Sequence, residues 1–231
     1  MIEENYRRVL SNIDAAVERR RARGDETVPV TLVAVTKNHD VNAMRECIDA
    51  GAAVVGENRV QEAKGKYETL ERSVTWHLIG HLQTNKVNQA VAMFDLIHSV
   101  DSEHLLTAVD TAAGKIGKVQ DILIQVNLAK EPQKYGVEEE ALEAVLKKAD
   151  ELPNVHLRGL MLIAPNYEDV EETRPLFRRM RELYLKVQGM SLPASDIEYL
   201  SMGMTNDYAI AVEEGANLVR VGTGIFGPRQ Y

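Results

Sequence analysis

The stretch TLVAVTKNH, residues 31–39, is an apolar run that ends abruptly at a lysine. Two valines, a leucine and an alanine in so short a run predict a strand that is buried on both faces, as strands of parallel sheets are. Lys37 then stands where this strand opens into a loop. A lysine at such a place either extends to solvent or is partly desolvated, and desolvation makes the free amine a better nucleophile.

Further runs of the same kind follow along the chain, separated by longer amphipathic stretches, and this alternation predicts repeated βα units and a parallel sheet. Eight strands preceded by one extra helix favour a single (β/α)8 TIM barrel, with an open doubly wound sheet as the alternative. The predicted strands are 30–36, 53–56, 76–79, 96–100, 121–127, 157–163, 197–201 and 218–221.

Helical periodicity fills the segments between these strands. An amphipathic first helix has its arginine-rich end at 18–24, where Gly24 stops it. Thr84, Asp101 and Thr205 are expected to cap three of the later helices. The predicted helices are those near 41–50, 58–71, 84–93, 102–113, 137–150, 168–188 and 205–214.

Composition narrows the class of protein. The chain has 231 residues and a net charge of −8, which opposes binding to nucleic acid and to anionic membranes. We expect a cytoplasmic protein without a membrane span, because the chain has one cysteine, Cys47, and its N-terminus is acidic and not apolar. We see no linker or compositional break and expect one domain, residues 1–231.

Two glycine turns near the end of the chain suggest a phosphate site. SMGMTND, 201–207, follows the predicted seventh strand, and VGTGIFG, 221–227, follows the eighth. Glycines let backbone N–H groups approach an anion, Ser201 and Thr223 add hydroxyl groups, and a helix beginning at 205 would add its N-terminal partial charge. A phosphate held after strands 7 and 8 lies beside strand 1 across the barrel seam, so a phosphorylated aldehyde there would reach Lys37.

Pyridoxal 5′-phosphate (PLP) fits that description because its aldehyde forms an aldimine with lysine and its phosphate needs an anion nest. A phosphosugar bound to an aldolase lysine is the competing ligand. Arg220, just before the second glycine turn, favours PLP, since a guanidinium can donate a hydrogen bond to the pyridine nitrogen without protonating it. A salt bridge at the barrel rim is the other interpretation of this arginine.

A series of motifs carries a resemblance over nearly the whole chain. The chain closely resembles the pyridoxal phosphate homeostasis proteins, single-domain relatives of the alanine racemase barrel. The motifs are LVAVTKNH, GENRVQE (56–62), WHLIGHLQTNK (76–86), SVDS (99–102), IQVNLAKEPQKYG (124–136), RGLMLI (158–163), YLSMGMTNDY (199–208) and VRVGTGIFG (219–227). The resemblance implies PLP fold type III without the C-terminal β-domain.

The resemblance also implies roles for particular residues. Lys37 would carry PLP as an aldimine, Asn58 would lie beside it, and Arg220 would meet the ring nitrogen. Two departures from the family pattern, Arg59 after GEN and His81 after WHLIG, concern the rim of the site. The residues implied to hold the phosphate are Ser201, Gly203, Gly222, Thr223 and Gly224.

The family's role is to bind PLP and maintain vitamin B6 balance, so we expect a PLP carrier with little or no catalytic turnover and no catalytic residue. Racemases of the related fold take a second base from a β-rich domain, and only ten residues follow Val221 here. The alternative is a PLP-dependent amino-acid racemase or D-amino-acid lyase. We expect a monomer, with PLP as ligand and apo PLP-dependent enzymes as candidate partners.

Two histidines, His77 and His81, are four residues apart, a spacing that on a helix would suggest a metal site. They fall instead on a predicted strand and the loop after it, so we expect structural or cofactor-lining roles and no metal. Tyr135 and Tyr208 are candidate bases, but nothing in the sequence places either of them opposite Lys37.

Overall fold

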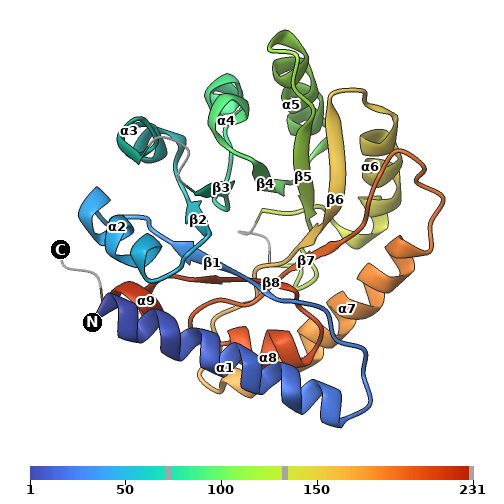
Figure 1. Ribbon diagram of the computed structural model, residues 1–231. Helices are drawn as coiled ribbons and strands as arrows, with labels where there is room; N and C mark the ends of the chain where they lie inside the picture. The colour runs from blue at the N-terminus through green and yellow to red at the C-terminus, as the bar shows by residue number, and fades with distance from the viewer. Residues whose placement is uncertain (71–73, 132–134, 229–231) are drawn as a thin grey trace.

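The computed structural model describes residues 1–70, 74–131 and 135–228, and these form a closed barrel of parallel strands surrounded by helices (Figure 1). Each strand pairs with the next in chain order. The ring closes where β8 (Leu218–Val221) pairs with β1 (Thr31–Val35), with Val33 opposite Arg220. The predicted (β/α)8 barrel is therefore confirmed, and the open sheet is wrong.

The predicted strands all form, with ends that shift by a few residues. The other strands are β2 (Val54–Glu57), β3 (Thr75–Leu78), β4 (Leu96–Val100), β5 (Gln120–Gln125), β6 (Val155–Met161) and β7 (Tyr199–Ser201). The helices are α1 (Ile2–Ala22), α2 (Val41–Asp49), α3 (Val60–Leu70), α4 (Val87–Met93), α5 (Glu103–Lys115), α6 (Glu139–Glu151), α7 (Arg174–Gln188), α8 (Tyr208–Glu213) and α9 (Thr223–Phe226), with 3-10 turns η1 (Thr84–Lys86) and η2 (Val170–Thr173).

The core has two layers because strand side chains alternate between the inside of the barrel and the helices. The inner layer contains a small apolar cluster, while the outer apolar layer runs continuously between the sheet and the helices. Each fully buried aliphatic side chain in these layers stabilises the fold by about 1.5–3 kcal/mol. The apolar cluster of the inner layer consists of Val33, Leu96, Leu123, Met161 and Leu218.

Helix α1 lies across the outside of the barrel beside α8 and α9 (Figure 1). Two of its asparagines fix these short helices: Asn5 Nδ2 donates to the carbonyl of Ile225 at 2.9 Å, and Asn12 Nδ2 donates to the hydroxyl of Tyr208 at 2.9 Å. The extra helix predicted at the N-terminus thus supports the segments that follow β7 and β8.

The helix starts differ from the predicted ones. The cap of α5 is Ser102, whose hydroxyl accepts from the N–H of Leu105, and not Asp101. Helix α8 begins at Tyr208 after Asp207, so Thr205 does not cap it and lies in the preceding turn. Thr84 caps no helix either, because it is the first residue of the turn η1 and α4 follows Lys86. No helix was predicted at α9, which is too short to show a periodicity.

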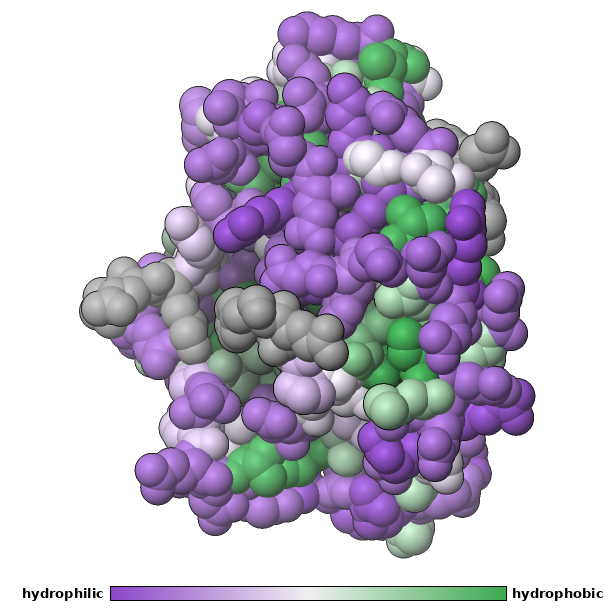
Figure 2. Space-filling view, turned by 90° about the vertical axis from the view of Figure 1, so that its left-hand side faces the viewer, coloured by the Kyte–Doolittle hydropathy of each residue, from purple (hydrophilic) through white to green (hydrophobic). Residues whose placement is uncertain are grey.

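One face of the molecule shows how polar and apolar residues are distributed on its surface. On the face in Figure 2, hydrophilic residues predominate and apolar residues are confined to small patches. Within the part of the chain that the structure describes, none of the helices combines the length and the apolar character needed to cross a membrane.

Candidate functional site

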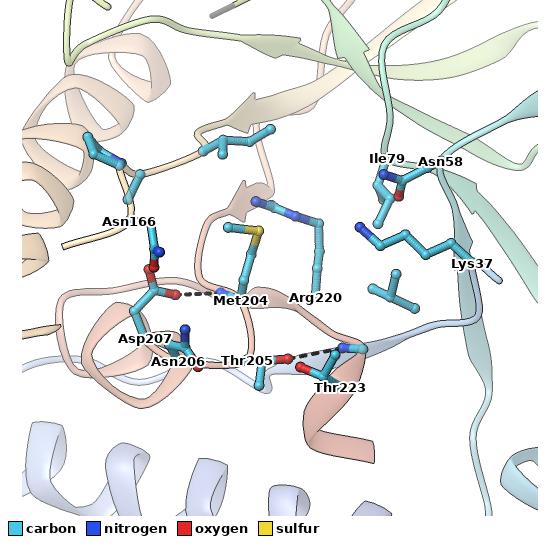
Figure 3. A pocket seen from close by; sticks show the side chains of 15 residues that line it. Lys37, Asn58, Ile79, Asn166, Met204, Thr205, Asn206, Asp207, Arg220 and Thr223 are labelled. Atoms are coloured by element: carbon cyan, nitrogen blue, oxygen red, sulfur yellow. Dashed lines mark hydrogen bonds between the residues drawn. The ribbon is translucent and has the colours of Figure 1, made fainter. Parts of the chain in front are cut away.

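A cavity of about 320 Å³ opens at the C-terminal ends of the strands, the end at which barrels of this type place their ligand sites (Figure 3). Segments from both ends of the chain meet in it. The described residues that line it are Val35, Lys37, Asn58, Ile79, Ile163, Ala164, Pro165, Asn166, Met204, Thr205, Asn206, Asp207, Arg220, Gly222 and Thr223.

The structure brings together five of the eight predicted site residues in this lining. Ser201, Gly203 and Gly224 are not among the lining residues. The five that line the cavity are Lys37, Asn58, Arg220, Gly222 and Thr223.

Lys37 follows β1 and extends its half-buried side chain into the cavity toward Arg220 (Figure 3). Asn58, just after β2, lies beside it. Its Oδ1 atom is buried, and none of the described residues donates a hydrogen bond to it. A buried amide oxygen without a donor is costly, so this atom is suited to accept a hydrogen bond from a bound molecule.

Arg220 projects from β8 and is only 3% exposed. Its guanidinium donates to two neutral oxygens: Ser201 Oγ, and the carbonyl of Leu162 at 2.9 Å. Burial lowers the pKa of Arg220 to about 10, while nearby Asp207 opposes that shift. The group remains a cation at neutral pH and keeps further N–H donors for a ligand in the cavity.

In the turn after β8, two backbone N–H groups point toward the same oxygen atom. The N–H groups of Gly222 and Gly224 both donate to Thr205 Oγ1, each at 3.3 Å, and the first of these bonds is drawn in Figure 3. A Cβ atom at Gly224 would lie 2.8 Å from Val221 Cγ1, so the turn needs glycine there. Two N–H groups that converge on one oxygen, with the hydroxyl group of Thr223 beside them, are donors of the kind that bind an anion.

Ser201 lies below the cavity, fully buried at the end of β7. Its hydroxyl contacts Arg220 and His98 Nδ1, the latter at 2.9 Å, and His98 Nε2 is 3.0 Å from His77 Nδ1. Burial lowers the pKa of His77 to about 3 and holds the pKa of His98 well below its usual value. A chain of hydrogen bonds between neutral groups thus supports Arg220 from beneath, and the sequence did not indicate it.

Gly203 makes the turn that leads away from β7. Its φ is +97°, and a Cβ atom there would lie 2.6 Å from the Cβ of Ala211. Its carbonyl accepts the backbone N–H of Arg220 at 3.0 Å. Gly203 therefore does not line the cavity and instead fixes the backbone of Arg220 through this hydrogen bond.

Asp207 is a lining residue that the sequence analysis missed. Its carboxylate accepts the N–H of Met204 at 2.6 Å and is almost fully buried. Burial raises the pKa of Asp207, and Arg220 opposes this change. The sequence signal was its place just before a helix, where aspartate is a common cap.

His81 and Tyr135 lie at the rim and not in the lining. Their rings stack with centroids 3.7 Å apart, and His81 Nδ1 is 3.4 Å from Asp101 Oδ2. His77 forms a hydrogen bond with His98 instead. His77 and His81, which are four residues apart in the sequence, therefore have separate partners. The described part of the chain contains no cluster of three or more metal-ligating side chains.

Comparison with known proteins identifies the family. The sequence pattern described as alanine racemase, N-terminal domain, matches residues 9–230. The pyridoxal phosphate homeostasis protein of Aquifex aeolicus is 43% identical over 99% of this chain and 98% of its own. This chain belongs to the pyridoxal phosphate homeostasis protein family.

Solved structures of similar proteins share the fold. PipY of Synechococcus elongatus PCC7942, in its structure with PLP bound, is 42% identical with a TM-score of 0.81, over 91% of this chain and 100% of that one. Alanine racemase of Streptomyces lavendulae is 18% identical with a TM-score of 0.72, and this chain spans 57% of it. The second likeness shows the barrel fold alone.

Proposed function

We propose that this chain binds PLP in the cavity at the C-terminal end of the barrel and serves in PLP homeostasis. One observation carries the proposal: Lys37, from the start of the barrel, and the glycine turn of β8, from its end, line the same cavity. The full-length relatives named for PLP homeostasis and the PLP-bound structure of PipY support it.

The residues present fit the parts of the cofactor. Lys37 Nζ would condense with the aldehyde carbon, forming a C=N bond as the aldehyde oxygen leaves in one molecule of water. The N–H groups of Gly222 and Gly224 would exchange their bonds to Thr205 Oγ1 for bonds to the phosphate, which the hydroxyl of Thr223 would also hold. Arg220 would donate to the ring nitrogen. Asn58 supplies the buried amide oxygen that lacks a donor. For Ser201 and Gly203 we propose an indirect role, since both contact Arg220 and not the cavity.

We further propose that turnover is slow. When bound, PLP supplies an electron-withdrawing ring, and it does so weakly if its nitrogen accepts a hydrogen bond without being protonated. Arg220 keeps its proton at neutral pH and therefore favours the weak form. The described lining residues also include neither a tyrosine nor a histidine as a second base. On this basis we propose a monomeric carrier that gives PLP to apo enzymes.

The test is a titration of the purified protein with PLP and with pyridoxal, which lacks the phosphate. We expect a visible absorption band with PLP, loss of the band in Lys37→Ala, and binding at least tenfold weaker for pyridoxal. Arg45→Met, a change at an exposed residue of α2, is the control. Failure of the wild-type protein to develop the band would contradict the proposal and leave a phosphosugar as the ligand.

A second measurement separates carrier from enzyme. PLP-loaded protein is incubated with a panel of L- and D-amino acids and analysed by chiral chromatography. The carrier role predicts no turnover at ordinary enzyme rates, which are about 1 per second or higher. Racemisation or cleavage at such a rate would favour the racemase or lyase instead.

A further inference from the structure

Three side chains next to β1, two of them buried and one partly exposed, form a network that touches the backbone on both sides of Lys37. They are Lys66 and Glu62 on α3 and Glu57 at the end of β2, and we call them the lysine clamp. Lys66 is 8% exposed and Glu57 is fully buried. Nothing in the proposed binding of PLP uses these three residues.

The contacts of the clamp close a loop around the backbone of Lys37. Lys66 Nζ donates to the carbonyl oxygen of Thr36 at 2.8 Å, to Glu57 Oε1 at 2.7 Å and to Glu62 Oε1 at 2.6 Å. The same Glu62 oxygen accepts the backbone N–H of Asn38. The residue before Lys37 and the residue after it are therefore tied to one ammonium group through short, charge-assisted hydrogen bonds.

A second observation points to the same segment. Asn38 has a φ of +63°, and it is one of two non-glycine residues with positive φ in the described chain. Such a backbone conformation costs free energy and persists where surrounding contacts impose it. The bond from Asn38 N–H to Glu62 is such a contact, and the turn it stabilises directs the Lys37 side chain into the cavity (Figure 3).

We propose that the lysine clamp positions Lys37 for covalent capture of the cofactor's aldehyde. Lys66, Glu57 and Glu62 are positioning residues, because they hold the backbone of residues 36 to 38 and do not line the cavity. A lysine whose main chain is fixed in this way presents its amine at one place, and misplacement of a reacting group by about 1 Å can cost a hundredfold in reactivity. The inference rests on the proposed function.

The experiment compares two ligands in one variant. Glu62→Ala removes the acceptor of Asn38 N–H. It leaves Lys66 paired with Glu57, so the variant keeps the buried ion pair that stabilises the fold. PLP and pyridoxine 5′-phosphate share a ring and a phosphate, but the second has no aldehyde. We expect Glu62→Ala to weaken PLP binding about tenfold and to change pyridoxine 5′-phosphate binding by less than about twofold.

Two further variants control for other effects. Glu62→Gln keeps an acceptor oxygen and should restore most of the PLP affinity. Glu68→Ala, at an exposed residue of the same helix, should bind both ligands like the wild type. Faster amide hydrogen exchange at Asn38 in Glu62→Ala, but not in Glu68→Ala, would show that the clamp has opened.

The inference is overturned if Glu62→Ala retains wild-type affinity for PLP, or if it weakens both ligands equally, since the second result indicates general damage to the cavity. A wild-type protein that binds neither ligand contradicts the proposed function itself and removes this inference with it. That outcome is separate from the others because it is seen before any substitution is made.

Discussion

Two buried cations flank the cavity, and their surroundings differ. Lys66 is 8% exposed and is paired with the carboxylates of Glu57 and Glu62. Arg220 is 3% exposed and donates to the neutral oxygens of Ser201 and Leu162. The Lys66 ammonium is paired directly with carboxylates, whereas the Arg220 guanidinium contacts neutral groups and has the carboxylate of Asp207 only nearby.

The difference separates a structural role from a binding role. A buried charge that is fully paired is costly to disturb, because removing one partner strands the other without compensation. A buried charge with neutral partners is itself costly, which agrees with the lowered pKa of Arg220. Such a group has donors to offer a ligand, so substitutions at the two cations should affect different properties.

The largest expected effect is on stability, from Lys66→Met. This change leaves Glu57 buried without its cation, and the free energy of unfolding should fall by about 3–5 kcal/mol. Urea unfolding monitored by circular dichroism measures the loss. Lys64→Met, at an exposed residue of the same helix, should change the free energy by less than about 0.5 kcal/mol. A loss below about 1 kcal/mol in Lys66→Met would remove the contrast between the two cations.

Arg220→Met should have the opposite profile. Loss of a charge-assisted hydrogen bond to the ring should weaken PLP binding by about 1.5–3 kcal/mol, or roughly ten- to a hundredfold. Stability should fall less than in Lys66→Met, because the direct hydrogen-bond partners of Arg220 are neutral and its loss leaves none of them as an unpaired ion. Fluorescence titration with PLP and urea unfolding give the two values. Equal PLP affinity in wild type and variant would show that Arg220 is structural after all.

The neutral support beneath Arg220 predicts a smaller effect that depends on pH. Burial depresses the pKa of His98, so the unfolded chain takes up a proton below about pH 6.5 that the folded protein does not. Stability should therefore fall as the pH falls, by up to about 1.4 kcal/mol per pH unit for this histidine. In His98→Gln that contribution is absent.

Unfolding of both proteins at pH 7.5, 6.5 and 5.5 provides the comparison. The stability of the wild type should fall more steeply than that of the variant between pH 6.5 and 5.5. Contributions from carboxyl groups with raised pKa values, such as Glu57 and Asp207, have the opposite sign and cancel in the difference. Parallel curves would mean that His98 is charged in the folded protein.

The sequence predicted the barrel because its strands are short β-branched runs that are buried on both faces, a pattern that survives without tertiary information. It also predicted Lys37 and Arg220 as cavity residues. Lys37 follows the first of these strands, and Arg220 lies within the last. The helix at α9 was missed because four residues cannot show a periodicity. The start of α8 was placed too early because Thr205 and Asp207 are both acceptable capping residues.

The features of the site that the sequence did not predict depend on contacts between residues that are distant in the chain. Ser201 was assigned to the phosphate from its position, but whether its hydroxyl faces the cavity or His98 is settled only by packing. Part of the lysine clamp is visible in the sequence, because Glu62 and Lys66 have the i,i+4 spacing of a helical ion pair. The sequence could not show that this pair is buried against Thr36, because that contact spans thirty residues.

The central claim is that Lys37 and the glycine turn of β8 hold the same molecule. The most direct test is to load the protein with PLP, reduce it with borohydride and map the modified peptide by mass spectrometry. The account predicts that the label lies on Lys37 and that excess inorganic phosphate reduces the labelling by competing at the turn. Label spread over several exposed lysines, or labelling of Lys37 that phosphate leaves unchanged, would contradict it.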